Sequence, residues 1–237
     1  MSSRARLVVI VCFTGVTLVF ARLGLWQMSR LQERRAANVV ALEARSAPRI
    51  RLDRATALTT ELNGRNVRVT GRYDHEHDVL LRGKAYGGSP GVEVVTPLVL
   101  DGGEMAVLVN RGFLPAPDAV TARTDSVREP GRIRVQGTAL TVSSGAGAPL
   151  ERDGYTTWAR LDRKALTARL PYSVAPVYVR QSPDAALPRF PRRLEPLPID
   201  DGPHLSYAIQ WFSFALMAVV FGGVIVRTNS VSGKEKA

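Results

Sequence analysis

Hydrophobic residues gather in two long runs near the ends of the chain and alternate with polar residues between them. The first run covers residues 7–28 and is interrupted only by Arg22, and the second covers residues 205–226 without any charge. A helix of about 22 residues is about 33 Å long, which is enough to cross a hydrocarbon core about 30 Å thick. We therefore expect one transmembrane helix at 7–28 and a second at 205–226.

The first run also has features of a cleaved signal peptide. Basic residues precede a short apolar stretch, and Val19-Phe20-Ala21 resembles a cleavage site. Cleavage there would leave Arg22 as the first mature residue, although the apolar run continues to Trp26. These features favour an uncleaved anchor, and a cleaved signal peptide stays the alternative.

Basic residues at the two chain ends predict the orientation of these helices. Positive flanks stay in the cytoplasm, and here they comprise Arg4, Arg6, Arg227, Lys234 and Lys236. A second basic group after the first span argues the other way, namely Arg30, Arg34 and Arg35. The orientation is decided by two further points. An even number of spans places both termini on the same side, and a long domain is translocated with its anchors largely regardless of its own charge. Both termini are expected in the cytoplasm, with residues 29–203 on the extracytoplasmic side.

The region between the two runs has the pattern of a β-rich domain. Polar and apolar residues alternate with the period of half-buried strands at 66–73, 78–84, 92–100, 105–113, 132–141 and 176–181. Helical patterns occur at 29–45, 52–62 and 161–170, and Asp101-Gly102-Gly103 predicts a hairpin turn. Six prolines in residues 182–203 predict an extended tether to the second helix. We expect a mainly antiparallel β domain of the α+β class, with a small barrel among the arrangements that these strands allow.

Composition excludes several functional classes. The single cysteine, Cys12, excludes an internal disulfide, a Cys-x-x-Cys redox pair and a cysteine-based zinc site. Four methionines and one cysteine do not supply the cluster that a copper chaperone needs. The net charge of +11 is not concentrated, because residues 29–203 hold 26 basic and 20 acidic residues without a dense basic run. This distribution disfavours a nucleic-acid-binding stripe and favours a solvated basic surface.

Two short motifs have the residues of catalytic or metal chemistry. Gly87-Gly88-Ser89-Pro90-Gly91 matches the G-x-S-x-G nucleophile elbow, but a strand pattern follows it, and Pro90 lacks the N–H that an oxyanion hole needs. A glycine-rich hairpin loop explains this motif better than a hydrolase site. On a strand, His75 and His77 would lie on one face as a pair of metal ligands. No third ligand has a recognisable spacing, which favours a solvated histidine-rich loop.

His204 stands at the predicted extracytoplasmic end of the second span. Tyr207, Ala208, Trp211 and Phe212 follow it at the i+3, i+4, i+7 and i+8 positions of one helix face. Such a face suits a planar amphiphilic ligand, with the histidine Nε2 on an iron and aromatic rings against a macrocycle. The alternative is a capping histidine beside an ordinary interfacial aromatic belt, which spacing alone favours.

Several stretches along the chain are similar to motifs of one known family. GLWQMSR at 24–30 resembles G-x-W-Q-x-x-R, and GRY at 71–73 with the later TPL at 96–98 resembles G-x-Y/F and T-P-L. VNRGFLP at 109–115 and HLSYAIQWF at 204–212 are similar to V-N/D-R-G-W-V-P and H-L-x-Y-A-x-x-W-F. Together they resemble the Surfeit locus protein 1 family, membrane-anchored assembly factors of haem–copper cytochrome c oxidase. Phe113 replaces a tryptophan of the family motif, and Asp201-Gly202-Pro203 stands where asparagines are usual.

The resemblance implies a non-enzymatic assembly factor that helps to form the haem a site of the oxidase's catalytic subunit. It implies His204 as a transient ligand of the haem a iron, with Trp26, Tyr207 and Trp211 as further residues of the pocket. Depth alone suggests Arg22 or Arg30 as partners of the haem propionates. Implied partners are the catalytic subunit and the machinery that synthesises haem a. The alternative is a structural partner that packs on a respiratory membrane subunit without binding cofactor, for which residues 218–222 offer a small-xxx-small face. An arginine-rich composition without a long transit segment suggests a bacterial plasma membrane.

Overall fold

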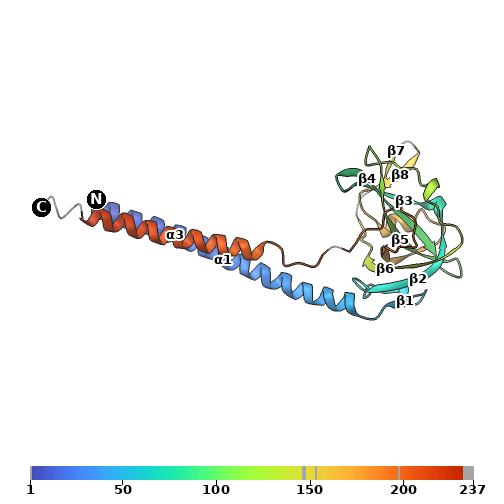
Figure 1. Cartoon of the computed structure of the whole chain (residues 1–237), viewed down its shortest axis with the longest axis horizontal. Helices are drawn as coiled ribbons and strands as arrows, with labels where there is room; N and C mark the ends of the chain where they lie inside the picture. Colours follow the sequence, from blue (N-terminus) through green and yellow to red (C-terminus); the bar gives the residue numbers. More distant parts are fainter. Residues whose placement is uncertain (1, 146–147, 153, 197, 232–237) are drawn as a thin grey trace. The chain divides into compact units, whose positions relative to one another are not determined.

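The computed structural model describes residues 2–145, 148–152, 154–196 and 198–231 (Figure 1). Contacts divide the chain into a helical unit, residues 1–42 and 199–237, and a β unit, residues 43–198. The helices are α1 Ser3–Ser46, α2 Arg163–Thr167 and α3 His204–Val231, with 3-10 turns η1 Thr56–Leu58, η2 His75–His77 and η3 Asp125–Val127. The strands are β1 Ile50–Leu52, β2 Asn66–Tyr73, β3 Val79–Tyr86, β4 Ser89–Val99, β5 Met105–Pro115, β6 Arg132–Thr141, β7 Leu150–Arg152, β8 Tyr155–Trp158 and β9 Ser173–Gln181.

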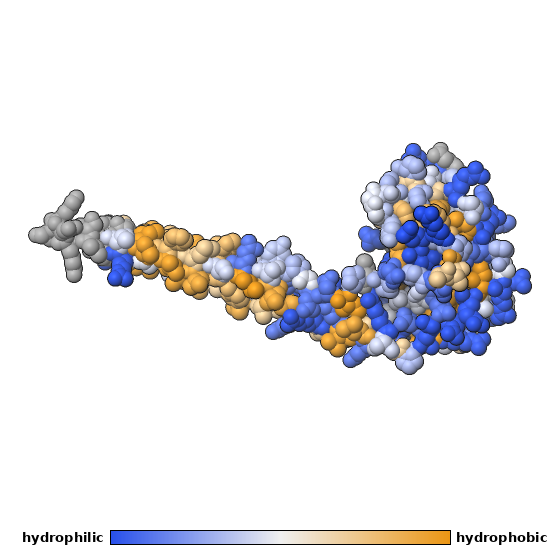
Figure 2. All heavy atoms as spheres, viewed as in Figure 1, coloured by the Kyte–Doolittle hydropathy of each residue, from blue (hydrophilic) through white to orange (hydrophobic). Residues whose placement is uncertain are grey.

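Within the helical unit, α1 and α3 run antiparallel and side by side (Figure 1). Phe13 lies at Gly222, Phe20 stacks on Trp211, and Gln27 lies at His204, so residue numbers rise along one helix as they fall along the other. Both helices are long and apolar enough to cross a membrane. Exposed apolar side chains gather at residues 7–26 of α1 and 205–224 of α3 (Figure 2), as expected for helical segments that face a hydrocarbon environment rather than water. The predicted helix at 29–45 continues the first apolar run without a break as part of α1.

Five strands of the β unit close into a barrel in the order β2-β6-β9-β5-β4. The barrel closes where β4 returns to β2, pairing Arg72 with Val99 and Tyr73 with Leu98. Four of the five contacts are antiparallel, and β5 with β9 is the parallel one. The remaining strands extend the sheet outside the barrel: β1 beside β2, then β3, β8 and β7 beyond β4. The prediction of a mainly antiparallel β domain is confirmed, and of the arrangements that the strands allowed, the structure has the small barrel.

The inside of the barrel is filled by the alternate residues of its strands. Val67 and Val69 of β2 point inward with Val107 and Val109 of β5, and all four are buried. β-branched side chains pack well on a pleated surface, and burying each contributes about 1.5–3 kcal/mol. Polar neighbours such as Arg68 and Arg72 stay on the outside, which is the alternation that the sequence pattern predicts.

The structure corrects several predicted elements. The predicted helix at 52–62 is wrong: Leu52 ends β1, which pairs in parallel with β2, and only the single turn η1 follows. His75 and His77 do not lie on a strand, as the metal-pair alternative requires; they form the 3-10 turn η2 between β2 and β3, in agreement with the favoured loop. The predicted helix at 161–170 shortens to α2, capped by the Asp162 carboxylate, and the last strand begins earlier, at Ser173. The short strands β7 and β8 were not predicted.

Residues 182–203, predicted as a tether, contain no helix or strand where the structure describes them. Part of this segment nevertheless lies on the barrel. Phe113 of β5 and Arg192 exchange backbone hydrogen bonds of 2.8 and 2.7 Å, and the Arg193 side chain is buried. The segment before α3 is therefore fastened to the β unit at residues 192 and 193.

Candidate functional site

His204 is the first residue of α3, and the turn before it fixes where the helix begins. Gly202 has a φ of +67°, a conformation that suits glycine, and its N–H donates to the Asp200 carboxylate at 2.9 Å. The Pro203 carbonyl then accepts from the Tyr207 N–H at 3.1 Å and from the Ser206 hydroxyl at 2.8 Å. Because the proline cannot continue a helix backwards and its carbonyl opens the helical ladder, the imidazole is held at the helix start.

The imidazole of His204 is hydrogen-bonded to Gln27 of α1. Its Nδ1 lies 2.9 Å from Gln27 Oε1, and the Gln27 side chain is buried. An amide oxygen only accepts hydrogen bonds, so a neutral imidazole paired in this way carries its proton on Nδ1 and keeps a lone pair on Nε2. Histidines that ligate a metal are usually oriented in this way by an acceptor on the other ring nitrogen. The pair is thus chemically suited to present Nε2 to a metal ion or a haem iron.

Small residues allow α1 and α3 to approach closely enough for this bond. A side chain at Gly24 would place its Cβ 2.6 Å from the ring of Phe212, and Ala208 is almost completely buried. Gly24, Gln27 and Leu31 are the buried residues of α1 and recur at spacings of three and four, which places them on one face of the helix. Small residues at a helix crossing permit such contact between membrane helices.

The loop before α3 is also attached to α1. Asn38 donates to the Asp200 carbonyl at 2.9 Å and to the Asp201 carboxylate at 3.2 Å, and Arg35 forms a 2.8 Å ion pair with Asp201. The hydrogen bond from Arg35 lowers the pKa of Asp201. Asp201, which replaces an asparagine of the family pattern, therefore gains a cationic partner on α1.

The other predicted pocket residues differ in their surroundings. Trp211 stacks on Phe20 with ring centroids 5.7 Å apart and meets Phe214 edge-on, so it contributes to the packing between the helices. Tyr207 and Trp26 are exposed by 47% and 55%, one turn after His204 and one residue before Gln27. Arg22 is exposed, and Arg30 forms a 2.6 Å ion pair with Glu33. Gln27, the residue that contacts His204, was not predicted as a site residue.

The V-N-R-G-F stretch forms a buried polar network. Arg111 is fully buried, donating to Glu129 at 2.7 Å and to the Val127 carbonyl, while Arg193 donates to the same carboxylate. Burial opposes ionisation of Glu129, but the hydrogen bonds and charges of Arg111 and Arg193 hold its pKa below the ordinary value. This motif therefore fastens the segment around Arg193 to the barrel.

The backbone at position 112 shows why this motif contains a glycine there. Its φ is +112°, and a Cβ there would lie 2.0 Å from the Arg192 carbonyl oxygen. Any other residue would be strained and would also displace the segment that pairs with Phe113.

The remaining candidate residues have partners within the β unit. Nε2 of His75 accepts from the Glu129 N–H at 3.0 Å, and Nδ1 of His77 lies 2.7 Å from the Asp74 carboxylate, which also accepts from Tyr172. No group of three or more metal-ligating side chains occurs in the described parts of the chain. Ser89 begins β4 directly after the Gly87–Gly88 turn, so the predicted hairpin loop is confirmed.

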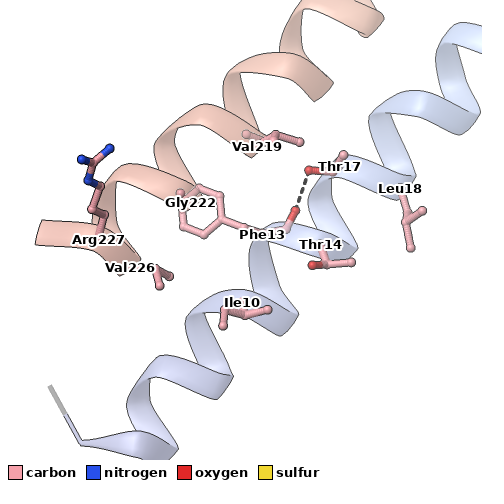
Figure 3. Close-up of a pocket in the computed structure, with 11 residues that line it drawn as sticks. Ile10, Phe13, Thr14, Thr17, Leu18, Val219, Gly222, Val226 and Arg227 are labelled. Carbon is pink, nitrogen blue, oxygen red and sulfur yellow. Dashed lines mark hydrogen bonds between the residues drawn. The ribbon is translucent and has the colours of Figure 1, made fainter. Parts of the chain in front are cut away.

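An apolar groove of about 480 Å³ lies between α1 and α3 at the end away from His204 (Figure 3). Phe13 and Gly222 are in close contact there, and Arg227 stands at the end of the groove near Val226. The Thr17 hydroxyl donates to the Phe13 carbonyl at 2.8 Å, so this polar group does not enter the groove unpaired.

Comparison with known proteins gives a consistent result along nearly the whole chain. The model of the SURF1 family matches residues 14–216. A SURF1-like protein of Monosiga brevicollis is 28% identical over 86% of this chain and 82% of its own length. An uncharacterized SURF1-like protein of Mycobacterium tuberculosis is 29% identical over 90% of this chain and 79% of its own length. A SURF1-like protein of Rickettsia felis is 25% identical over 97% of this chain and 99% of its own length.

Proposed function

The chain belongs to the SURF1 family, and we propose that it is an assembly factor of haem–copper cytochrome c oxidase that assists haem a insertion into the catalytic subunit. The observation that carries the proposal is the His204–Gln27 hydrogen bond. It leaves Nε2 of His204 available at the end of a long apolar helix, beside the exposed ring of Tyr207.

Haem a suits this donor set. The iron of a porphyrin binds a neutral imidazole nitrogen. His204 would supply that nitrogen, Gln27 would orient the ring, and Tyr207 and Trp26 would contact the macrocycle. The helical unit offers apolar surface on α1 and α3 for the hydrophobic part of such a ligand. In this role the chain holds a cofactor or its apo-subunit and does not act as an enzyme.

The proposal includes a membrane location with a defined topology. Arg4 and Arg227 lie at the same end of the antiparallel helix pair, and positive flanks stay in the cytoplasm. Lys234 and Lys236, which support the same orientation, lie outside the described residues. The β unit would then face the extracytoplasmic side of a bacterial plasma membrane, where the catalytic subunit and the haem a synthesis machinery are the proposed partners.

The competing function is a structural one, in which the helices pack on a respiratory membrane subunit and no cofactor is bound. The apolar groove supports this alternative, because Ala218 and Gly223 line it, and small residues in an apolar face permit close packing of a further helix. The first function requires His204 as a haem ligand, whereas the structural function does not.

Reduced-minus-oxidised spectra of membranes from cells lacking the gene test the proposal. We expect the haem a band to fall while the b- and c-type bands persist, and the wild-type gene to restore it. A gene encoding His204→Ala should fail to restore the band, whereas His77→Ala, a histidine of the β unit, should restore it. Full restoration by His204→Ala would favour the structural function, and an unchanged band in the deletion strain would contradict both.

A further inference from the structure

Five arginine side chains line one open cleft on the outside of the β unit. The cleft has a volume of about 650 Å³ and is lined by Arg49, Arg51, Arg68, Thr70, Arg132 and Arg134. These residues come from three segments that are far apart in sequence: the start of β1, the middle of β2 and the start of β6. Basic residues that are dispersed along the sequence are thus gathered on one face by the sheet.

Strand pairing explains how the arginines become neighbours. In β1, β2 and β6 every second residue points outward, and the register places Arg51 opposite Arg68 and Thr70 opposite Arg134. Arg72 and Arg132, also directly opposite each other, continue the basic row along β2 and β6. Neighbouring strands are about 4.8 Å apart, and outward residues recur every 6.6–6.8 Å or so along a strand. Like charges in directly opposite positions destabilise a sheet, so the arrangement does not serve the stability of the fold.

Few carboxylates neutralise this surface. Arg132 forms a 2.6 Å ion pair with Asp101, and the charge of Arg51 acts on nearby Asp53. In the part of the chain that the structure describes, no carboxylate lies within ion-pair distance of Arg49, Arg68 or Arg134. Guanidinium groups without acidic partners, held in a row on a rigid sheet, are preorganised to bind an anionic ligand.

We propose that this arginine cleft is a docking surface for an extended acidic segment of a partner protein, with carboxylates at alternate positions. The side chains on one face of an extended segment recur at the same spacing as Arg132 and Arg134 of β6, so carboxylates at alternate positions each meet a guanidinium fork there, and Arg68 and Arg51 flank the segment on the neighbouring strands. The cleft is larger than one small anion requires. Its lining has no aromatic side chain for stacking bases, and no apolar side chain for insertion into a lipid surface. The proposal goes beyond haem handling and does not depend on His204.

The experiment uses the full-length protein in a nonionic detergent. The probe is a fluorescein-labelled peptide of about nine residues that alternates aspartate with threonine, and a peptide with asparagine in place of aspartate is its control. Fluorescence anisotropy gives the affinity of the wild type, of Arg68→Gln with Arg134→Gln, and of Arg123→Gln with Arg160→Gln. The last pair removes the same charge from exposed positions outside the cleft.

We expect the acidic peptide to bind the wild type, and binding to weaken about tenfold or more in the cleft variant but not in the control variant. The cleft variant should unfold at a temperature equal to or above that of the wild type, because Arg51 no longer faces another cation. Equal losses in the two variants, or a lower unfolding temperature of the cleft variant, would overturn the proposal. Binding of anionic phospholipid vesicles or of polyuridylate that depends on Arg68 and exceeds peptide binding would overturn it in favour of a membrane or an RNA.

Discussion

Nδ1 of His204 lies 2.9 Å from Oε1 of Gln27, although 177 positions separate the two residues along the chain. The bond joins the first residue of α3 to the buried face of α1. It fixes the tautomer of the imidazole and directs Nε2 away from its partner. Two of the family-like motifs, GLWQMSR and HLSYAIQWF, are thereby connected by a single hydrogen bond.

Replacement of Gln27 tests whether this bond serves ligand binding. In Gln27→Leu the His204 N–H loses its acceptor, and the ring is free to turn, as when the outer partner of a metal-binding histidine is removed. We expect the affinity of the purified full-length protein for haem a to fall about 10- to 100-fold, measured by titration of the Soret band. Gln32→Leu removes an exposed glutamine of the same helix and should leave the affinity unchanged. An unchanged affinity in Gln27→Leu would show that Gln27 does not orient a ligand.

Gly24 allows α1 and α3 to approach closely, and the hydrogen bond between Gln27 and His204 depends on this approach. A larger side chain there would collide with Phe212, since a Cβ already lies 2.6 Å from its ring. We expect Gly24→Leu to separate α1 from α3 and to weaken haem binding without changing His204 itself. Cysteines introduced by Phe20→Cys and Trp211→Cys, in a Cys12→Ser background, report the separation as a lower yield with a short thiol-specific cross-linker.

Gly15→Leu is the matched control for this substitution, because nothing lies within 4 Å of a Cβ at Gly15. Its cross-linking yield should equal that of the parent. If Gly24→Leu cross-links as well as the parent does, Phe212 moves aside and the close approach is not needed.

The strands of the barrel could be predicted from sequence because their alternation directly reflects which face is buried. The patterns at 66–73 and 132–141 correspond to β2 and β6 with the same bounds. The barrel's closure could not be derived in this way, since the pairing of Tyr73 with Leu98 depends on contacts between distant segments. The same reason explains why β1, which overlaps the predicted helix at 52–62 only at Leu52, was not predicted as a strand: it pairs with β2, a segment distant in sequence.

The candidate site could be predicted only in part. His204 is conspicuous because it stands at the start of an uncharged run, whereas Gln27 is a polar residue in an apolar helix whose partner cannot be seen in the sequence. Its spacing from Gly24 and Leu31 was the available signal, since the three form the buried stripe of α1. The arginine cleft was missed for a related reason: Arg51, Arg68 and Arg134 come together only through the register of three strands.

Glu129 makes stability depend on pH. Its folded-state pKa lies below the ordinary value of 4.5 because Arg111 and Arg193 bind the carboxylate despite its burial. A carboxyl group with a depressed pKa stabilises the fold fully above about pH 4.5, and this contribution is lost as the pH falls through the folded-state pKa. We expect Glu129→Gln to destabilise the protein by about 3–5 kcal/mol at neutral pH, because it leaves two buried guanidinium groups without a counter-charge. The difference from the wild type should narrow below about pH 4.5.

The stability difference is measured by thermal unfolding of the full-length protein in detergent at several pH values, followed through the circular dichroism signal of β-structure. Glu104→Gln is the control, because Glu104 pairs with Arg54 at an exposed position and should contribute at most about 1 kcal/mol. If the unfolding temperatures of Glu129→Gln and the wild type differ by the same amount at every pH, the pH dependence does not come from Glu129.

Gly112 holds the segment before α3 against the barrel, and Gly112→Ala should release it. The new Cβ would lie 2.0 Å from the Arg192 carbonyl oxygen, at a φ of +112° that alanine rarely adopts. Strain of this kind costs about 1–3 kcal/mol, and loss of the Phe113–Arg192 backbone bonds adds to it, so we expect more than about 3 kcal/mol of destabilisation. Gly131→Ala is the comparison: its φ of +90° imposes the same backbone strain, but no atom lies within 4 Å of the added Cβ. It should therefore lower the free energy of unfolding by less. Limited proteolysis of the full-length protein should cut residues 182–196 faster in Gly112→Ala than in Gly131→Ala, and equal cutting rates would show that the segment is held by other contacts.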